Sequence, residues 1–140
     1  MFNAQTRGRA RPIVTGDTEF FWQGTRDRRL LVQRCSACGV TRHPPGPACP
    51  RCRSLDWEPH ELPATGRLYS YTVQHHPLPA GCDGPCTIAV VELDQEIRLV
   101  SNVIDVDPDD LQIGELLEVV FVDQEEGWTA PQFRRPTVQP

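Results

Sequence analysis

The chain has 140 residues, enough for one domain or for two very small ones that share a core. Its 14 prolines and 10 glycines predict many turns and short strands, and no apolar run approaches the roughly 18 residues that span a membrane. Lysine is absent, since all 14 basic residues are arginines, and this excludes chemistry through a lysine Schiff base.

Charge divides the chain into two parts of opposite sign. Residues 1–53 hold ten arginines and three acids, a balance of +7, whereas residues 54–140 hold four arginines and sixteen acids, a balance of −12. Two differently charged modules are the simplest interpretation. The arginine-rich N-terminus leads into no apolar segment, so we expect no secretory signal and a cytoplasmic location. Paired cysteines in that compartment bind metal more often than they form disulfides.

The predicted elements begin with a flexible arm over residues 1–16 and a helical segment over residues 17–29. Asp17 is the expected N-cap of a short helix in "TEFFWQGT" that ends near Gly24.

Three adjacent aromatic residues lie in this predicted helix: Phe20, Phe21 and Trp22. They cannot share one face, because successive residues of a helix are about 100° apart. Two interpretations remain open. The aromatics pack against this chain's own ribbon, or some of them form an interface with a partner protein.

Residues 30–62 are predicted to form a zinc ribbon. Two C-x-x-C pairs, ten residues apart, lie between a short strand at "LLVQR" and a returning strand around Trp57. Each pair offers two thiolates from one turn, and structural zinc prefers four such ligands in a tetrahedron. A site closed by four cysteines has no open position for substrate, so we expect a structural Zn²⁺. The predicted ligands are Cys35, Cys38, Cys49 and Cys52.

A second group of potential metal ligands follows further along the chain, and consists of His75, His76, Cys82 and Cys86. The favoured interpretation is a polar loop between two strands with two incidental thiols. A metal site remains open as an alternative, as does a bridge between the two cysteines under oxidising conditions.

Residues 63–136 are predicted to form a five-stranded OB-fold barrel, with a sandwich as the alternative. The alternation in "GRLYSYTVQHH" predicts one strand face with Leu68 and Ser70 and the opposite face with Tyr69 and Tyr71. Further strands are expected at residues 87–93, 97–104 and 116–122 and in "TAPQFRRP", with a tight turn at 94–96 and a helical turn capped at Asp107. The expected fold is therefore mainly β: a short N-terminal helix, a rubredoxin-like zinc ribbon and the barrel.

The sequence carries no familiar catalytic motif. It has no G-x-S-x-G, Walker loop, G-x-G-x-x-G or H-E-x-x-H pattern. We therefore predict no catalytic residue, and we expect the chain not to be catalytic by itself.

The order of the motifs resembles the domain of unknown function 35 family. The similarity runs over residues 18–136 and combines "FW.G", "QRC..CG...HPP...CP.C", "G.LYSYTV.HHP", "IGE..EVVF" and "PQFRRP". Members are zinc-ribbon/OB-fold proteins of acyl-CoA metabolism that act beside a thiolase-fold enzyme or a MaoC-type hydratase. The resemblance implies an accessory subunit of an aldolase or thiolase that stabilises its partner and shapes the CoA entrance. It also implies a two-plus-two assembly, and aldolases of this kind cleave steroid side chains as CoA thioesters.

Two surface assignments accompany this resemblance. The aromatic helix is the expected partner interface. The basic N-terminal half is expected to attract the phosphates of CoA, for which the guanidinium fork is well suited, although ordinary surface charge is the alternative. The arginines concerned are Arg26, Arg28, Arg29 and Arg42.

Other functions compete with this one. A freestanding acyl-CoA binding protein and a partner of a MaoC-type hydratase are both consistent with the residues. A nucleic-acid-binding module is disfavoured, because the barrel half carries a charge of −12 that repels phosphate backbones. We expect neither nucleic acid nor membrane as a partner.

Overall fold

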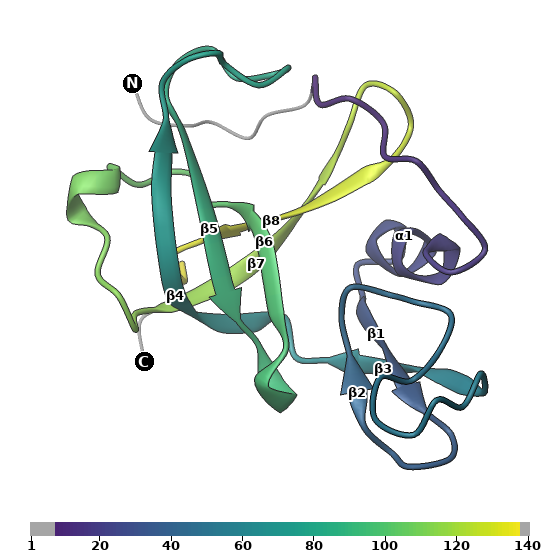
Figure 1. Ribbon diagram of the computed structural model, residues 1–140. Coiled ribbons are helices and arrows are strands. Elements are labelled where there is room, and N and C mark those ends of the chain that lie inside the picture. Colours follow the sequence, from purple (N-terminus) through teal and green to yellow (C-terminus); the bar gives the residue numbers. More distant parts are fainter. Residues whose placement is uncertain (1–7, 138–140) are drawn as a thin grey trace.

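The computed structural model describes residues 8–137, in which short strands dominate and no helix is long and apolar enough to cross a membrane (Figure 1). In chain order the elements of this described part are α1 (Glu19–Arg26), β1 (Leu30–Cys35), β2 (Thr41–Arg42), β3 (Trp57–Leu62), β4 (Thr65–Gln74), β5 (Cys86–Glu92), the 3₁₀ turn η1 (Asp94–Glu96), β6 (Arg98–Asn102), the 3₁₀ turn η2 (Pro108–Asp110), β7 (Leu116–Asp123) and β8 (Thr129–Arg134).

The strands form two antiparallel sheets, one with the order β2-β1-β3 and one with the order β6-β5-β4-β7-β8. The larger sheet curls until its two edges meet. Val103, just after β6, forms a parallel bridge with Phe133 of β8, and the Ile104 N–H donates to the Phe133 carbonyl at 2.8 Å. The sheet is thus a nearly closed barrel. The predicted mainly β fold with a five-stranded barrel is confirmed.

The faces of β4 differ from the alternation expected along it. The pairing of β4 with β5 shifts register between Leu68 and Ser70, which marks a β-bulge. Leu68 is buried, Tyr69 and Ser70 are both exposed, and Tyr71 turns inward to donate its hydroxyl to the Pro108 carbonyl at 3.2 Å. The expectation that Leu68 and Ser70 share a face is wrong, because a bulge inserts one residue and reverses the alternation beyond it.

Helix α1 begins and ends later than the sequence suggests. Its N-cap is Thr18 and not Asp17, and the helix continues past Gly24 to Arg26. Gly24 is buried against β1, where an added Cβ would lie 2.9 Å from the Leu31 side chain. The glycine therefore permits the helix to approach the ribbon closely and does not terminate it.

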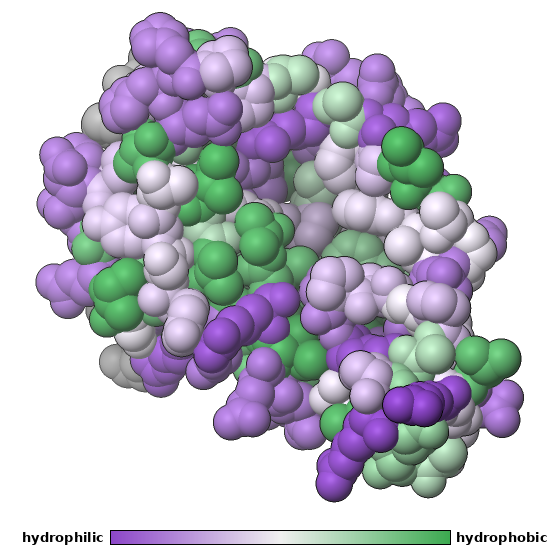
Figure 2. All heavy atoms as spheres, in the orientation of Figure 1, coloured by the Kyte–Doolittle hydropathy of each residue, from purple (hydrophilic) through white to green (hydrophobic). Residues whose placement is uncertain are grey.

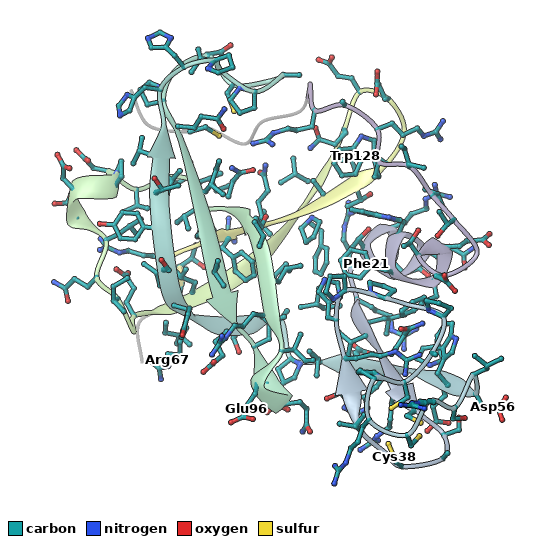
Figure 3. All side chains as sticks on the ribbon, in the orientation of Figure 1. Phe21, Cys38, Asp56, Arg67, Glu96 and Trp128 are labelled. Carbon is teal, nitrogen blue, oxygen red and sulfur yellow. The ribbon has the colours of Figure 1, made fainter. Side chains whose placement is uncertain are left out.

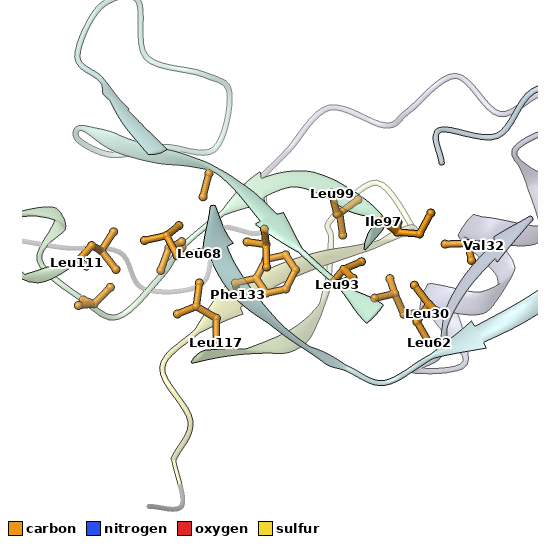
Figure 4. Packing of buried hydrophobic residues seen from close by; sticks show 14 of the residues in the cluster. Leu30, Val32, Leu62, Leu68, Leu93, Ile97, Leu99, Leu111, Leu117 and Phe133 are labelled. Atoms are coloured by element: carbon orange, nitrogen blue, oxygen red, sulfur yellow. The ribbon is translucent and has the colours of Figure 1, made fainter. Parts of the chain in front are cut away.

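The buried apolar side chains of both sheets and the helix form one continuous cluster (Figure 4). Leu30 and Leu62 of the ribbon lie beside Leu93 and Ile97 at the end of the barrel, and Phe21 of α1 joins the same cluster. The ribbon is thereby packed onto the barrel end that holds the β5–β6 turn.

The segment before α1 lies against the turn between β7 and β8 (Figure 1). The Arg9 N–H donates to Gln124 Oε1 at 3.0 Å, the Arg11 N–H donates to Glu126 Oε2 at 2.7 Å, and Trp128 Nε1 donates to the Arg9 carbonyl at 3.3 Å. These bonds fix residues 9–11 on the barrel. The rest of the predicted arm, residues 1–7, lies outside the described residues.

Candidate functional site

The two C-x-x-C turns bring four sulfur atoms to one point at the tip of the ribbon, near the label of Cys38 in Figure 3. All four Sγ atoms lie within 4.8 Å of one another, with Cys35 and Cys52 3.5 Å apart and Cys38 and Cys49 3.6 Å apart. Zn–S bonds of about 2.3 Å in a tetrahedron place sulfurs about 3.8 Å apart. The spacing therefore fits four ligands around one Zn²⁺, as the sequence predicted.

The two turns repeat the same backbone pattern. Cys35 N–H donates to the Val40 carbonyl at 2.8 Å and Gly39 N–H donates back to the Cys35 carbonyl at 2.9 Å. In the second turn, Cys49 N–H donates to Ser54 at 2.9 Å and Arg53 N–H donates back to Cys49 at 2.8 Å. The equivalent residues have positive φ, 79° at Gly39 and 67° at Arg53. This conformation suits glycine and is strained for arginine, so the second turn is the more strained of the two.

The turns also favour the ionised form of two ligands. N–H groups of Cys52 and Arg51 lower the pKa of Cys49 to about 6, and those of Cys38 and Ala37 lower the pKa of Cys35. The Ser54 N–H acts the same way on Cys52, yet bonds to the neighbouring sulfurs raise the pKa of Cys52 to about 11. Four adjacent thiolates repel one another, so a divalent cation is required to keep them all ionised.

The second group of potential ligands does not assemble. Within residues 8–137, the ribbon cysteines are the one set of three or more Cys, His, Asp or Glu side chains whose ligand atoms cluster. His75 and His76 are exposed in the β4–β5 connection, whereas Cys82 Sγ and Cys86 Sγ lie 2.7 Å apart. These four side chains thus do not meet at one point in the described structure, and the two cysteines lie together without the histidines.

The three helix aromatics all have partners inside the chain. Phe20 packs on Trp57 of the ribbon with ring centroids 4.6 Å apart, and Trp22 meets Trp128 edge to face at 5.4 Å. Phe21 between them is only 5 % exposed. The interpretation in which they pack within the chain is correct for Phe21, while the partly exposed edges of Phe20 and Trp22 remain available to a partner.

The four arginines suggested for CoA have different surroundings. Arg28 forms a two-bond ion pair with Asp123 at 2.9 Å, and Arg29 pairs with Glu61 at 2.9 Å. Arg26 is exposed at the last turn of α1. Arg42 is 8 % exposed and donates to Gln33 Oε1 at 2.9 Å, so it braces the interior of the ribbon and presents no surface to a phosphate.

An apolar pocket of about 620 Å³, which the sequence analysis did not foresee, opens between the barrel and the helix. The space-filling view shows this face hollowed there, with hydrophobic side chains along the hollow (Figure 2). Aromatic residues from three distant segments contribute walls: Phe21 and Trp22 of α1, His43 of the ribbon, and Trp128, which lies above Phe21 in Figure 3. Polar side chains enter the lining at Arg9, Asn102 and Gln132. No single stretch of sequence could have revealed a pocket built from segments so far apart.

His43 connects the ribbon to this pocket. Its ring lies 5.3 Å from that of Phe21, and its Nδ1 is buried without a hydrogen-bond partner among the residues described. Burial lowers the pKa of the His43 imidazole, because a charged ring is poorly solvated there. The pocket therefore presents a neutral imidazole at neutral pH.

Two family models match the chain in succession. The model described as "ChsH2, rubredoxin-like zinc ribbon domain" matches residues 22–58, and "ChsH2, C-terminal OB-fold domain" matches residues 59–122. A "DUF35 domain-containing scaffold protein" of Methanocaldococcus jannaschii is 33% identical over 103 residues, which are 71% of this chain and 73% of that protein. The chain belongs to the DUF35 family. Its four-cysteine centre is accordingly the structural zinc site of a rubredoxin-like ribbon.

Longer proteins also resemble this DUF35 protein. A probable enoyl-CoA hydratase alpha subunit of Thermomonospora curvata is 41% identical over 126 residues, covering 90% of this chain and 40% of that subunit. The 3-oxo-4,17-pregnadiene-20-carboxyl-CoA hydratase alpha subunit of Mycobacterium tuberculosis is 34% identical over 113 residues, covering 81% and 36%. The DUF35 protein thus spans about two fifths of the length of these subunits.

Among solved structures, a chain of an "Ltp2-ChsH2(DUF35) aldolase" has the same fold. It superimposes with a TM-score of 0.85 at 41% identity, over 91% of this DUF35 protein and 100% of that chain. The similarity therefore includes helix, ribbon and barrel together.

We predict that Cys35→Ser loses zinc and unfolds the ribbon, because one of four ligands is removed and metal binding supplies folding energy in so small a unit. Zinc affinity should fall more than about 100-fold, the upper end of what loss of a mere supporting group costs. Zinc titration with a colorimetric chelator measures this. Cys82→Ser is the matched control and should keep its zinc; equal loss in both variants would contradict the assignment.

We predict that His43 makes the protein less stable in mild acid. Its pKa is lowered in the folded state, so the unfolded chain binds the proton more tightly, and stability falls as the pH drops through the unfolded value of about 6.5. Urea unfolding from roughly pH 7 to pH 5 should show a shallower decline for His43→Phe than for wild type. His76→Phe, an exposed histidine that also precedes a proline, should follow wild type. A His43→Phe profile parallel to wild type would refute the effect.

Proposed function

We propose that this protein is a non-catalytic accessory subunit of a thiolase-fold acyl-CoA enzyme, an aldolase that cleaves a carbon–carbon bond of a CoA thioester. The observation that carries the proposal is the 41% identity to a chain of an aldolase over all of that chain. The thiolase fold of the partner is part of the proposal and follows from the family resemblance. A reducing cytoplasm suits it, because the ribbon cysteines must stay reduced to bind zinc.

The chemistry of the pocket supports a role without catalysis. Among the described residues, His43 has no hydrogen bond to a nucleophile, and the Ser101 hydroxyl donates to the Pro131 carbonyl. A general base must lie within hydrogen-bond reach of the proton that it removes. The mostly apolar lining is thus suited to hold an apolar group.

We place the partner interface around helix α1 and the pocket rim. Phe20 and Trp22 are partly exposed on the helix, with Phe21 buried beneath them. On the rim, Ile13 is 89 % exposed and Val100 is 65 % exposed. Exposed apolar side chains that gather around a cavity are typical of contact surfaces.

The substrate in this proposal is a bulky apolar acyl-CoA of the steroid side-chain class. The pocket volume of about 620 Å³ falls within the range of roughly 300–1,000 Å³ usual for such ligands. The Mycobacterium tuberculosis relative is named for a pregnadiene carboxyl-CoA. Most of the CoA would be held by the partner, with its phosphates reaching Arg26 at the end of α1. Arg28 and Arg29 would have to exchange their acidic partners for the phosphates, and Arg42 is too buried to contribute.

A second candidate is an accessory subunit of a MaoC-type hydratase. The observation in its favour is the 41% identity to a part of a probable enoyl-CoA hydratase alpha subunit. The two candidates differ in the partner that the chain retains, so one set of co-purifications distinguishes them.

We predict that the protein co-purifies with a thiolase-fold partner encoded beside it, as a complex of two copies of each chain by light scattering. Val100→Asp should weaken the assembly about 30-fold, the effect of losing a contact worth 2 kcal/mol at an interface. Leu55→Asp is the control, because Leu55 is as exposed but lies on the ribbon. A monomeric chain in the presence of the thiolase-fold partner would refute the proposal, and retention of a hydratase alone would favour the second candidate.

We predict that Arg26→Ala raises the KM of the assembled enzyme for its CoA thioester about tenfold and leaves kcat unchanged. A contact to a CoA phosphate stabilises the bound substrate and the transition state equally, so its loss weakens binding without slowing the chemical step. Steady-state kinetics measure both constants. Arg51→Ala, an exposed arginine of the ribbon, should leave both constants as they are. An unchanged KM in Arg26→Ala would remove this arginine from the CoA site.

A further inference from the structure

Cys82 and Cys86 form a thiol pair that contacts two residues of the pocket lining, Arg9 and Asn102, and lies far from the ribbon cysteines in sequence. Cys82 lies in the β4–β5 connection and is partly exposed, whereas Cys86 is the first residue of β5 and is 4 % exposed. Their Sγ atoms are 2.7 Å apart. One sulfur is therefore accessible from solvent, and the other lies directly behind it.

Polar side chains from two other segments converge on these sulfurs. Arg9 Nη2 lies 3.5 Å from Cys82 Sγ, 3.3 Å from Cys86 Sγ and 2.5 Å from Asn102 Oδ1. Asn102 Nδ2 lies 3.3 Å from Cys86 Sγ and donates to the Thr87 carbonyl at 3.0 Å. The guanidinium of Arg9 and the amide of Asn102 thus contact the sulfur pair directly. In the described chain no carboxylate is paired with Arg9.

The backbone is shaped to allow this contact. Gly81 has a φ of +84°, and a Cβ placed there would lie 2.8 Å from the Gly8 carbonyl carbon. The segment that carries Arg9 therefore crosses the β4–β5 connection at a point where only glycine fits.

The geometry of the pair differs from that of the zinc ligands. Ribbon sulfurs stand 3.5 and 3.6 Å apart, as ligands around one ion do, and the 2.7 Å between Cys82 and Cys86 is shorter. Among residues 8–137, no third Cys, His, Asp or Glu side chain joins the pair in a cluster of possible metal ligands. Two thiols in such contact are suited to bond with each other and not to share a metal.

We propose that Cys82 and Cys86 form a reversible disulfide, distinct from the zinc site, that fastens the β4–β5 connection to β5 beside the pocket. The oxidant is a low-molecular-weight disulfide. The Cys82 thiolate attacks one of its sulfurs, forms a mixed disulfide and releases one thiol. Cys86 then loses its proton and attacks Cys82 Sγ, which closes the protein disulfide and releases the second thiol, so two electrons pass from the protein to the oxidant.

The order of the two steps follows from burial. Cys82 is the sulfur that an outside disulfide can reach. Burial is the largest cause that raises the pKa of Cys86 to about 11, so Cys86 remains a thiol until the mixed disulfide is in place next to it.

The disulfide would alter the pocket as well as the connection. Gln74 at the end of β4 and Pro79 within the connection line the pocket, and so do Arg9 and Asn102. Arg9 and Asn102 contact the sulfurs that oxidation joins, so the change reaches the pocket lining. This inference concerns the chain alone and does not depend on the proposed function.

The experiment treats the zinc-loaded full chain with oxidised glutathione, then alkylates free thiols and measures the intact mass and the peptide map. In the reduced protein the partly exposed Cys82 should take an alkyl group, whereas the buried Cys86 and the four zinc ligands should stay unmodified. The oxidised protein should take none, show a Cys82–Cys86 bridge in the peptide map, keep its zinc and recover the Cys82 site on reduction. A persistent glutathione adduct on Cys82, or a bridge between ribbon cysteines with loss of zinc, would overturn the proposal.

Two arginine variants test whether the environment of the pair matters. Arg9→Gln should slow disulfide formation about fivefold or more, because the positive guanidinium that contacts both sulfurs is removed. Arg11→Gln is the matched control, since only its backbone N–H is bonded to the barrel and its side chain is exposed. Equal rates in the two variants would overturn the role assigned to Arg9.

Discussion

Leu30 and Leu62 of the ribbon pack into the same buried cluster as Leu93 and Ile97 of the barrel. Neither unit is large enough to bury much apolar surface alone, so each completes the core of the other. Phe21 extends this cluster into helix α1. The position of the helix relative to the barrel, and hence the pocket between them, follows from this shared core. The zinc centre acts at the other end of the ribbon, where few apolar side chains are available.

Features of the fold that are set by residues close together in sequence were predicted correctly. The C-x-x-C pairs predicted the four zinc ligands, and the caps and turns at Asp107 and at 94–96 predicted both 3₁₀ turns. Errors arose where a distant contact decides the outcome. Gly24 permits close packing against Leu31 although glycine usually ends helices, and the bulge after Leu68 reverses an alternation that looked regular. The pocket is lined by residues from distant segments of the chain, so no short stretch of sequence could predict it.

Charge and burial also sort the arginines in a way that composition cannot. The Arg42 guanidinium donates hydrogen bonds to Gln33 and to the Gly46 carbonyl inside the ribbon. Arg28 and Arg29 form ion pairs with acids of the barrel and of β3. The opposite charges of the two halves of the chain are thus partly matched across the junction. Only a few N-terminal arginines, Arg26 among them, keep an exposed charge for another molecule.

The six cysteines lie in two different environments, one suited to bind zinc and one in which two thiols touch. Four project from two matching turns at distances set by a tetrahedron, where backbone N–H groups stabilise thiolates for a metal. Two lie in direct contact under an arginine and an asparagine, with one sulfur exposed and one buried. Arg9 contacts these sulfurs from the segment before α1 and also lines the pocket. The cysteine pair therefore lies where that segment, the barrel and the pocket meet. The C-x-x-C spacing already separates the four zinc ligands from Cys82 and Cys86, but no spacing pattern shows the contact between these two sulfurs or the arginine against them.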